Sequence, residues 1–115
     1  MKKHSMKLNP EPFKMIQEGI KTIELRLYDE KRKRISVGDV ITFTNTADLK
    51  ENLCVKVIDL YIFDSFVELY KSLPLLECGY TDANINIASP YDMEKYYSKE
   101  EQQKYGVVGI KISHM

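Results

Sequence analysis

Three charged side chains of opposite sign crowd the stretch from residue 19 to residue 26. Lys21, Glu24 and Arg26 follow Gly19, a residue that allows a tight backbone turn. Side chains two positions apart on a β-strand project from the same face, so Glu24 and Arg26 are expected to point the same way, with Lys21 just before them. An ammonium, a carboxylate and a planar guanidinium in one place form either a site for a polar, anionic ligand or a row of surface ion pairs of little energetic value.

The strand that must position these groups is predicted by strict alternation over residues 22–28. Its apolar face consists of Ile23, Leu25 and Leu27. Its other face carries the polar row Thr22, Glu24, Arg26 and Tyr28. This pattern is typical of a half-buried strand with a polar outer row, and it places Tyr28 among the candidate ligand-binding residues.

A second candidate binding feature is the run of four cations from Lys31 to Arg34. Lys31 and Arg32 directly follow Asp29 and Glu30. Consecutive cations suit contact with the phosphates of a nucleic acid, but they also suit a solvated loop. Four tyrosines between residues 91 and 105 offer faces on which a base can stack, although tyrosines at helical spacing more often pack against the core.

No metal or cofactor is expected from the sequence. His4 and His114 lie near opposite ends of the chain, and no group of His, Cys and acidic residues has the spacing of metal ligands. Cys54 and Cys78 have neither metal nor redox spacing, so we expect buried thiols in a reducing cytoplasm. The glycines form no phosphate-binding loop.

Composition bounds the class of protein. The chain has 115 residues, with 17 Lys and Arg against 17 Asp and Glu, and so a net charge of zero. The longest apolar run, residues 60–63, is far shorter than the roughly 20 residues that a membrane span needs. We therefore expect a single cytoplasmic domain covering residues 1–115. The charges are unevenly placed: residues 1–34 hold ten basic and five acidic groups, a net of +5, which leaves a local basic face or chance scatter as interpretations.

Strands and helices alternate irregularly along the chain. Strands are predicted over residues 6–8, 22–28, 40–45, 53–63 and 107–112. Helices are predicted from Pro10, over residues 66–73, from Pro90, and from Ser98 to about Gly106, with a charged linker at 29–34 and a loop at 79–86. This order favours an α+β fold built on a small, mostly antiparallel β-barrel with flanking short helices.

The spacing Gly19-x-Lys21-x-x-Glu24-x-Arg26 resembles the ASCH domain family of PUA-like proteins. The Gly38-Asp39 turn with its following strand, and the closing stretch 96–110, extend this resemblance over nearly the whole chain. The resemblance implies a small barrel with a cleft lined by Lys21, Glu24 and Arg26. It also implies a role in RNA metabolism, with RNA or a modified nucleoside as ligand, and Tyr28, Lys31 and Arg32 are expected as further ligand contacts.

Two other functions are open at this point. Some small family members are amidohydrolases that release acetyl from N4-acetylcytidine without a metal. The resemblance implies Lys21 and Glu77 as catalytic residues. The residue three after the lysine is Glu24 here rather than the family's threonine, and Glu24 is a candidate catalytic residue as the proton shuttle for a water that attacks the amide. Glu68 fits the position of the second acid less well than Glu77. A protein-interaction module without ligand chemistry is the third function, and it would be favoured by a cleft filled with apolar side chains.

Overall fold

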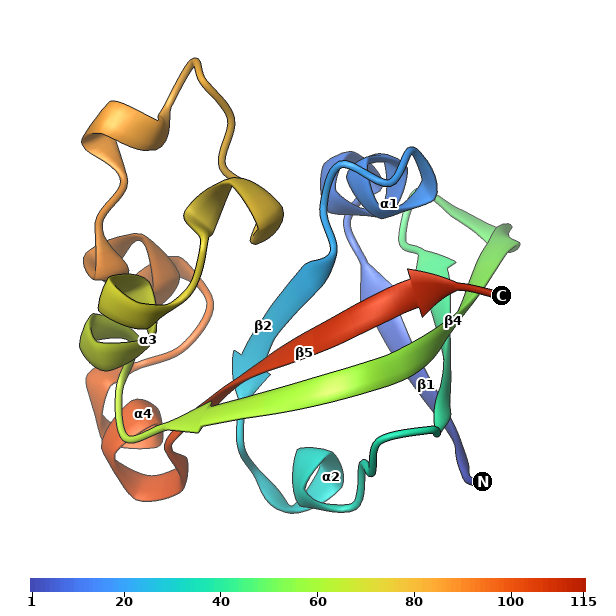
Figure 1. Ribbon diagram of the computed structural model, residues 1–115, viewed down its shortest axis with the longest axis horizontal. Helices are drawn as coiled ribbons and strands as arrows, with labels where there is room; N and C mark the ends of the chain where they lie inside the picture. The colour runs from blue at the N-terminus through green and yellow to red at the C-terminus, as the bar shows by residue number, and fades with distance from the viewer.

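Five strands form one curled, mixed sheet in the order β1-β3-β4-β5-β2 (Figure 1). The computed structural model describes residues 1–115, and its strands are β1 (Lys3–Leu8), β2 (Ile23–Leu27), β3 (Val40–Asn45), β4 (Asp48–Phe63) and β5 (Val107–His114). The pairings β3–β4, β4–β5 and β5–β2 are antiparallel, and β1 pairs with β3 in parallel. The predicted α+β fold with a mostly antiparallel sheet is confirmed. The sheet is a curled half-barrel.

Short helices connect the strands. They are α1 (Pro10–Gln17), α2 (Glu30–Lys33), α3 (Phe66–Ser72) and α4 (Lys99–Tyr105), with 3₁₀ turns η1 (Leu75–Glu77), η2 (Ile85–Ile87) and η3 (Pro90–Lys95). None of the helices is long and apolar enough to cross a membrane. We call residues 66–105 the helical lobe, and Figure 1 shows it beside β2, away from both chain ends.

Capping residues explain most helix boundaries. The predicted starts are confirmed at Pro10, which follows the cap Asn9, and at Ser98, whose hydroxyl accepts from the Glu101 backbone N–H in a capping box. The prediction of a charged linker over residues 29–34 is wrong. The Asp29 side chain accepts a hydrogen bond from the backbone N–H of Arg32, so it caps one helical turn, α2.

Strand β2 is buried on both faces. Its apolar face belongs to a cluster with Phe66 and Leu69 of the helical lobe. On its other face Glu24 and Arg26 lie opposite Ile110 and Val108 of β5, and residues paired across antiparallel strands point the same way. Ile110 and Val108 belong to the main core, so the expected polar outer row faces the interior of the half-barrel, and the expectation that it faces solvent is wrong.

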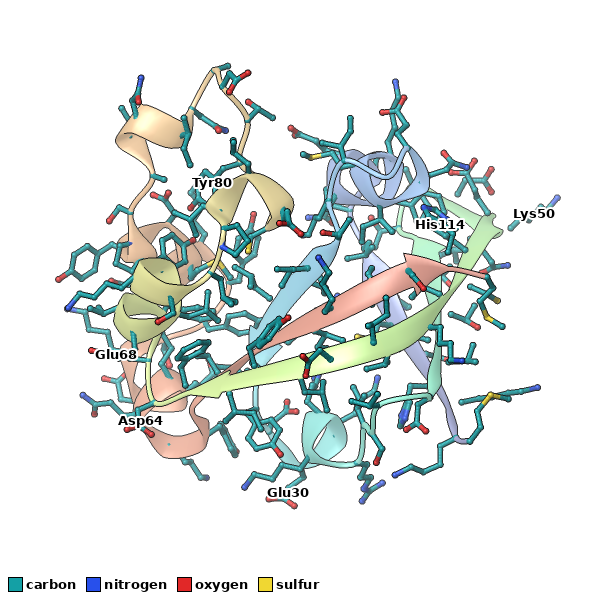
Figure 2. The ribbon with its side chains drawn as sticks, in the orientation of Figure 1. Glu30, Lys50, Asp64, Glu68, Tyr80 and His114 are labelled. Atoms are coloured by element: carbon teal, nitrogen blue, oxygen red, sulfur yellow. The ribbon has the colours of Figure 1, made fainter.

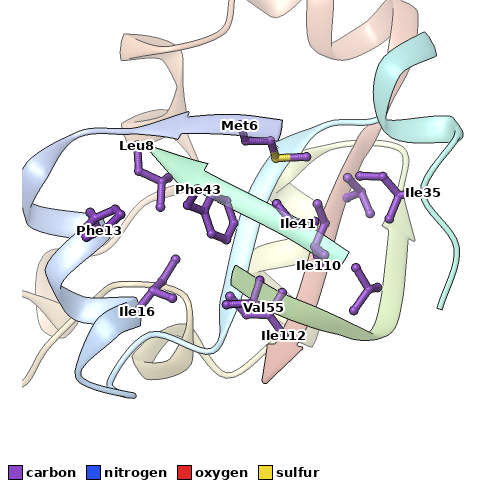
Figure 3. Packing of buried hydrophobic residues seen from close by; sticks show 12 residues of the cluster. Met6, Leu8, Phe13, Ile16, Ile35, Ile41, Phe43, Val55, Ile110 and Ile112 are labelled. Atoms are coloured by element: carbon purple, nitrogen blue, oxygen red, sulfur yellow. The ribbon is translucent and has the colours of Figure 1, made fainter. Parts of the chain in front are cut away.

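The main core fills the concave side of the sheet beneath α1. Twelve buried residues form this cluster, among them Phe13 and Ile16 of α1, Phe43 of β3, and Ile110 of β5 (Figure 3). The thiols divide between core and surface: Cys78 is buried, whereas Cys54 is exposed on β4, contrary to expectation. Position 54 faces outward with Thr42, whose Oγ1 is 3.4 Å from the Cys54 Sγ.

The edge strand β1 is joined through side chains, instead of a backbone ladder, to the other edge strand, β2, and to the following helix α2. Arg26 Nη2 donates to the Lys7 carbonyl oxygen at 2.8 Å. Lys31 Nζ donates to the Ser5 carbonyl oxygen at 2.8 Å. Both carbonyls belong to β1, whose unpaired edge would otherwise be open to pairing with another chain. These contacts bridge the open side of the half-barrel.

Asp39 joins the start of β1 to the turn before β3. Its carboxylate accepts from the backbone N–H groups of Lys2 and Ser36, each at 2.9 Å, and lies 2.9 Å from His4 Nε2. The hydrogen bond with His4, followed by those with the two backbone groups, holds the pKa of Asp39 well below its ordinary value. The ionised carboxylate therefore stabilises the native state.

Replacing Asp39 with asparagine is expected to destabilise the protein at neutral pH. It should also make the free energy of unfolding depend less on pH in the acidic range. Because the pKa of Asp39 is lower in the native state, its carboxylate stabilises the protein at pH values above the unfolded-state pKa of about 3.9. This stabilisation is lost as the pH falls through the lower native pKa. Urea unfolding of Asp39→Asn and wild type should therefore show a stability gap at pH 6 that narrows below about pH 4. Asp82→Asn, at an exposed position, is the control. A gap of constant size across this range would contradict the assignment.

Candidate functional site

A cavity of about 630 Å³ lies between β2, the start of α1 and the helical lobe. The polar residues that line it come from both sides. They include Lys7, Lys21, Glu24 and Arg26 on the sheet side, and Tyr70, Tyr80, Asp92, Lys95, Tyr96 and Tyr97 in the lobe. This volume falls in the range of small-molecule sites, roughly 300–1,000 Å³.

Glu24 is the centre of the charged group in this cavity. Its Oε1 lies 2.7 Å from Lys21 Nζ and its Oε2 accepts from Arg26 Nε at 2.7 Å. The Lys21, Glu24 and Arg26 side chains are only 11%, 4% and 14% exposed. Burial by itself would raise the pKa of Glu24, but the charges of Lys21 and Arg26 more than offset burial, so this pKa lies below its ordinary value. Glu24 is therefore an ionised, buried carboxylate.

Gly79 shapes the path of the Lys21 side chain. Gly79 has φ +112°, in the region that favours glycine, and a Cβ built there would lie 3.5 Å from Lys21 Cδ and 3.7 Å from Nζ. The Lys21 side chain thus passes directly over the backbone of the helical lobe. Sheet and lobe meet at this contact.

A chain of hydrogen bonds holds the opposite wall. The hydroxyls of Tyr70 and Tyr80 lie 2.7 Å apart, and the Tyr80 hydroxyl donates to Asp92 Oδ2 at 2.7 Å. Asp92 also accepts from the Ser89 backbone N–H. Burial, reinforced by the bonds with Tyr70 and Asp92, raises the pKa of Tyr80. The chain links α3 to η3 and braces the lobe where it borders the cavity.

The structure brings together Lys21, Glu24 and Arg26 but places Glu77 elsewhere. Glu77 does not line the cavity. Its carboxylate accepts from Thr22 Oγ1 at 2.8 Å and lies 2.5 Å from Lys111 Nζ, and its side chain is 40% exposed. The hydrogen bond from Lys111, then that from Thr22, lowers the pKa of Glu77. Glu68 is exposed on α3 (Figure 2).

The other expected ligand contacts also lie away from the cavity. Tyr28 packs partly buried against the main core, and Lys31 Nζ is engaged with the Ser5 carbonyl. Arg32 Nη1 donates to Asp29 at 3.0 Å, and its buried Nε has no partner. These residues serve the packing around α2 and the β1 edge. No group of three or more His, Cys, Asp or Glu side chains is arranged to hold a metal ion.

On the lobe side of the cavity, Tyr96 and Tyr97 are among the tyrosines that the sequence offered for base stacking, but sequence reasoning missed Tyr70, Tyr80 and Asp92. Tyr70, Tyr80 and Asp92 come from a helix, a predicted loop and a 3₁₀ turn. The only local signal among them is the Ser89-Pro90 helix start, which accounts for Asp92 as a capping residue. Nothing in the spacing relates Asp92 to Tyr80.

The curled half-barrel, with a charged cavity between one edge strand and a helical lobe, defines a small α+β domain built around one ligand-sized cavity. The chain belongs to the ASCH domain family, whose profile matches residues 6–115. Among curated proteins none matches the sequence.

Several solved structures are similar to this chain in fold. The crystal structure of hypothetical protein PH0355 is 33% identical, with a TM-score of 0.80 and coverage of 98% of this chain and 99% of that one. The solution structure of PF0455 from Pyrococcus furiosus is 32% identical, with a TM-score of 0.73 and coverage of 98% and 97%. A mutant form of the ASCH protein from Zymomonas mobilis is 15% identical, with a TM-score of 0.69 over 100% of this chain and 72% of that one, and shows the fold alone.

Removing the Tyr80 hydroxyl is expected to loosen the lobe wall of the cavity. Tyr80→Phe leaves the Tyr70 hydroxyl without its partner and deprives Asp92 of a donor, and the loss of these partly buried hydrogen bonds costs about 0.5–1.5 kcal/mol each. Chemical denaturation should show this loss, and hydrogen exchange should become faster in residues 80–97. Tyr91→Phe, at an exposed tyrosine, is the control and should behave as wild type. Unchanged exchange in Tyr80→Phe would show that the hydroxyl chain does not hold the wall.

Proposed function

We propose that this ASCH domain binds RNA or a nucleotide-like ligand in the cavity that contains Lys21, Glu24 and Arg26. The observation that carries the proposal is the buried group of two cations and one carboxylate at the wall of an open, ligand-sized cavity. ASCH domains are generally proposed to bind RNA, which agrees with this chemistry.

The cavity offers each kind of contact that a nucleotide needs. Lys21 and Arg26 are donors for phosphate or carbonyl oxygens, and Glu24 is an acceptor for amino groups. Tyr96 lines the cavity and is 62% exposed, so its ring is free to stack with a base. Polar recognition and aromatic stacking are thus available in one place.

The geometry favours binding over amide hydrolysis. A general base works best with a pKa near the working pH, and the lowered pKa of Glu24 makes that carboxylate a weak base. Lys21 is paired with Glu24 at 2.7 Å, and Glu77 is engaged with Thr22 and Lys111 outside the cavity. A pure protein-interaction module is disfavoured because the cavity is open and lined by charged side chains.

Removing either cation is expected to weaken ligand binding by about tenfold or more, since a hydrogen bond to a charged group contributes roughly 1.5–3 kcal/mol. Lys21→Met and Arg26→Gln would be compared with wild type by fluorescence anisotropy on short single-stranded RNA carrying a 5′-phosphate. Thermal shift with nucleosides and nucleoside monophosphates extends the test to small ligands. Lys71→Met removes an exposed lysine outside the cavity and should leave binding unchanged.

Two results would count against binding in this cavity. Equal affinities for wild type, Lys21→Met and Arg26→Gln would show that the ligand lies elsewhere. Release of acetate from N4-acetylcytidine by wild type, above the level of Lys21→Met, would instead establish the hydrolase function.

A further inference from the structure

The charges buried at the cavity wall do not balance. Lys21 and Arg26 share the single carboxylate of Glu24, which leaves a net charge of +1 on side chains that are 4–14% exposed. The other charged residues of the lining, Lys7 and Lys95 against Glu11 and Asp92, are equal in number. Taking an ion out of water costs several kcal/mol unless an opposite charge compensates it. The cavity therefore carries a net positive charge that favours binding of an anion.

Hydrogen-bond donors are also left unused there. A guanidinium has five N–H groups, and Arg26 donates through Nε to Glu24 and through Nη2 to the Lys7 carbonyl oxygen, so three N–H groups have no protein acceptor. An ammonium has three donors, and Glu24 engages Lys21 Nζ at 2.7 Å, so two more remain. Unused donors on two neighbouring cations, with a net positive charge, match the oxygens of a phosphate group.

Burial differs sharply between the two parts of the cavity. Lys21 and Arg26 are 11% and 14% exposed, whereas Tyr96 is 62% exposed and Ile87 is 80% exposed. Tyr96 and Ile87 therefore lie at the mouth of the cavity, and the unused donors of Lys21 and Arg26 lie deeper inside it. A phosphodiester within a continuous strand needs chain on both sides, which suits an open groove better than a buried wall.

We infer that the cavity recognises a terminal phosphate, carried either by a nucleoside monophosphate or by the phosphorylated end of a single strand. The phosphate lies against Lys21 and Arg26, and the base lies at the mouth beside Tyr96. This inference rests on the proposed function and specifies its ligand class and orientation. The opposite orientation puts the base inside, with an amino group donating to Glu24.

Glu24→Gln separates the two orientations by its effect on the preference for a monophosphate over its nucleoside. With the phosphate inside, the change raises the local charge from +1 to +2 and removes repulsion, so this preference increases, even where loosening of Lys21 and Arg26 lowers both affinities. With the base inside, one acceptor oxygen becomes an amide NH2 group, so the nucleoside and its monophosphate lose affinity together. Lys21→Met, with Lys71→Met as its control, gives an independent readout if Glu24→Gln folds poorly.

The experiment compares matched ligands that differ only in phosphate. Isothermal titration would use each nucleoside beside its 5′- and 3′-monophosphates, with inorganic phosphate as a competitor. Anisotropy would use one RNA sequence with either a phosphate or a hydroxyl at its end. We expect at least one monophosphate to bind about tenfold or more tightly than its nucleoside, and this preference to be lost in Lys21→Met. Preference for phosphorylated RNA, or for free monophosphates alone, identifies which source the cavity takes.

Each contrary result has its own meaning. Equal binding of nucleoside and monophosphate, equal binding of the two RNA ends, or an unchanged or smaller preference for the monophosphate in Glu24→Gln would overturn the terminal-phosphate inference while leaving RNA or nucleotide binding in place. Absence of binding by every RNA and every nucleotide would overturn the proposed function itself.

Discussion

A carboxylate that is almost completely buried must be matched by positive charge, and Glu24 meets this need from two directions. Arg26, on the same strand, reaches past Glu24 to the Lys7 carbonyl of the other sheet edge. Lys21 extends over Gly79 at the border of the helical lobe. The ion pairs of Glu24, together with the hydrogen bond from Arg26 to Lys7, therefore connect both edge strands and the lobe. The geometry of the cavity depends on this connection.

Strand β2 carries this network because both of its faces are covered. Its apolar side packs on the helical lobe, where Phe66 is fully buried, and its polar side faces the inside of the half-barrel. Functional side chains on a strand held from both sides keep a defined geometry better than side chains on a loop. The lobe wall is braced separately, by the hydroxyl chain from Tyr70 to Asp92. Two independently supported walls thus enclose the ligand-sized space.

The structure confirms local predictions and corrects those that depended on environment. Alternation predicted β2, and the cap residues predicted the starts of α1 and α4, because these signals act within a few residues. The polar row of β2 was expected to face water, since one half-buried face is the usual condition of an antiparallel strand. In the structure the helical lobe covers the apolar face, and the polar face points into the half-barrel beside core residues of β5. The charged linker proved to be α2 because Asp29 caps it.

The sequence by itself determined the α+β class, the main elements and the spacing that sets Glu24 and Arg26 on one face. Only the tertiary structure decided that Lys21 joins them in a buried network, and that Glu77 pairs with Lys111 instead. It alone brought Tyr80 and Asp92 to the facing wall. The physical reason is the separation along the chain of the residues that interact. Strand and helix patterns reflect the backbone geometry of neighbouring residues. Burial and charge pairing depend on contacts between segments that are distant in the chain, and no local pattern records these.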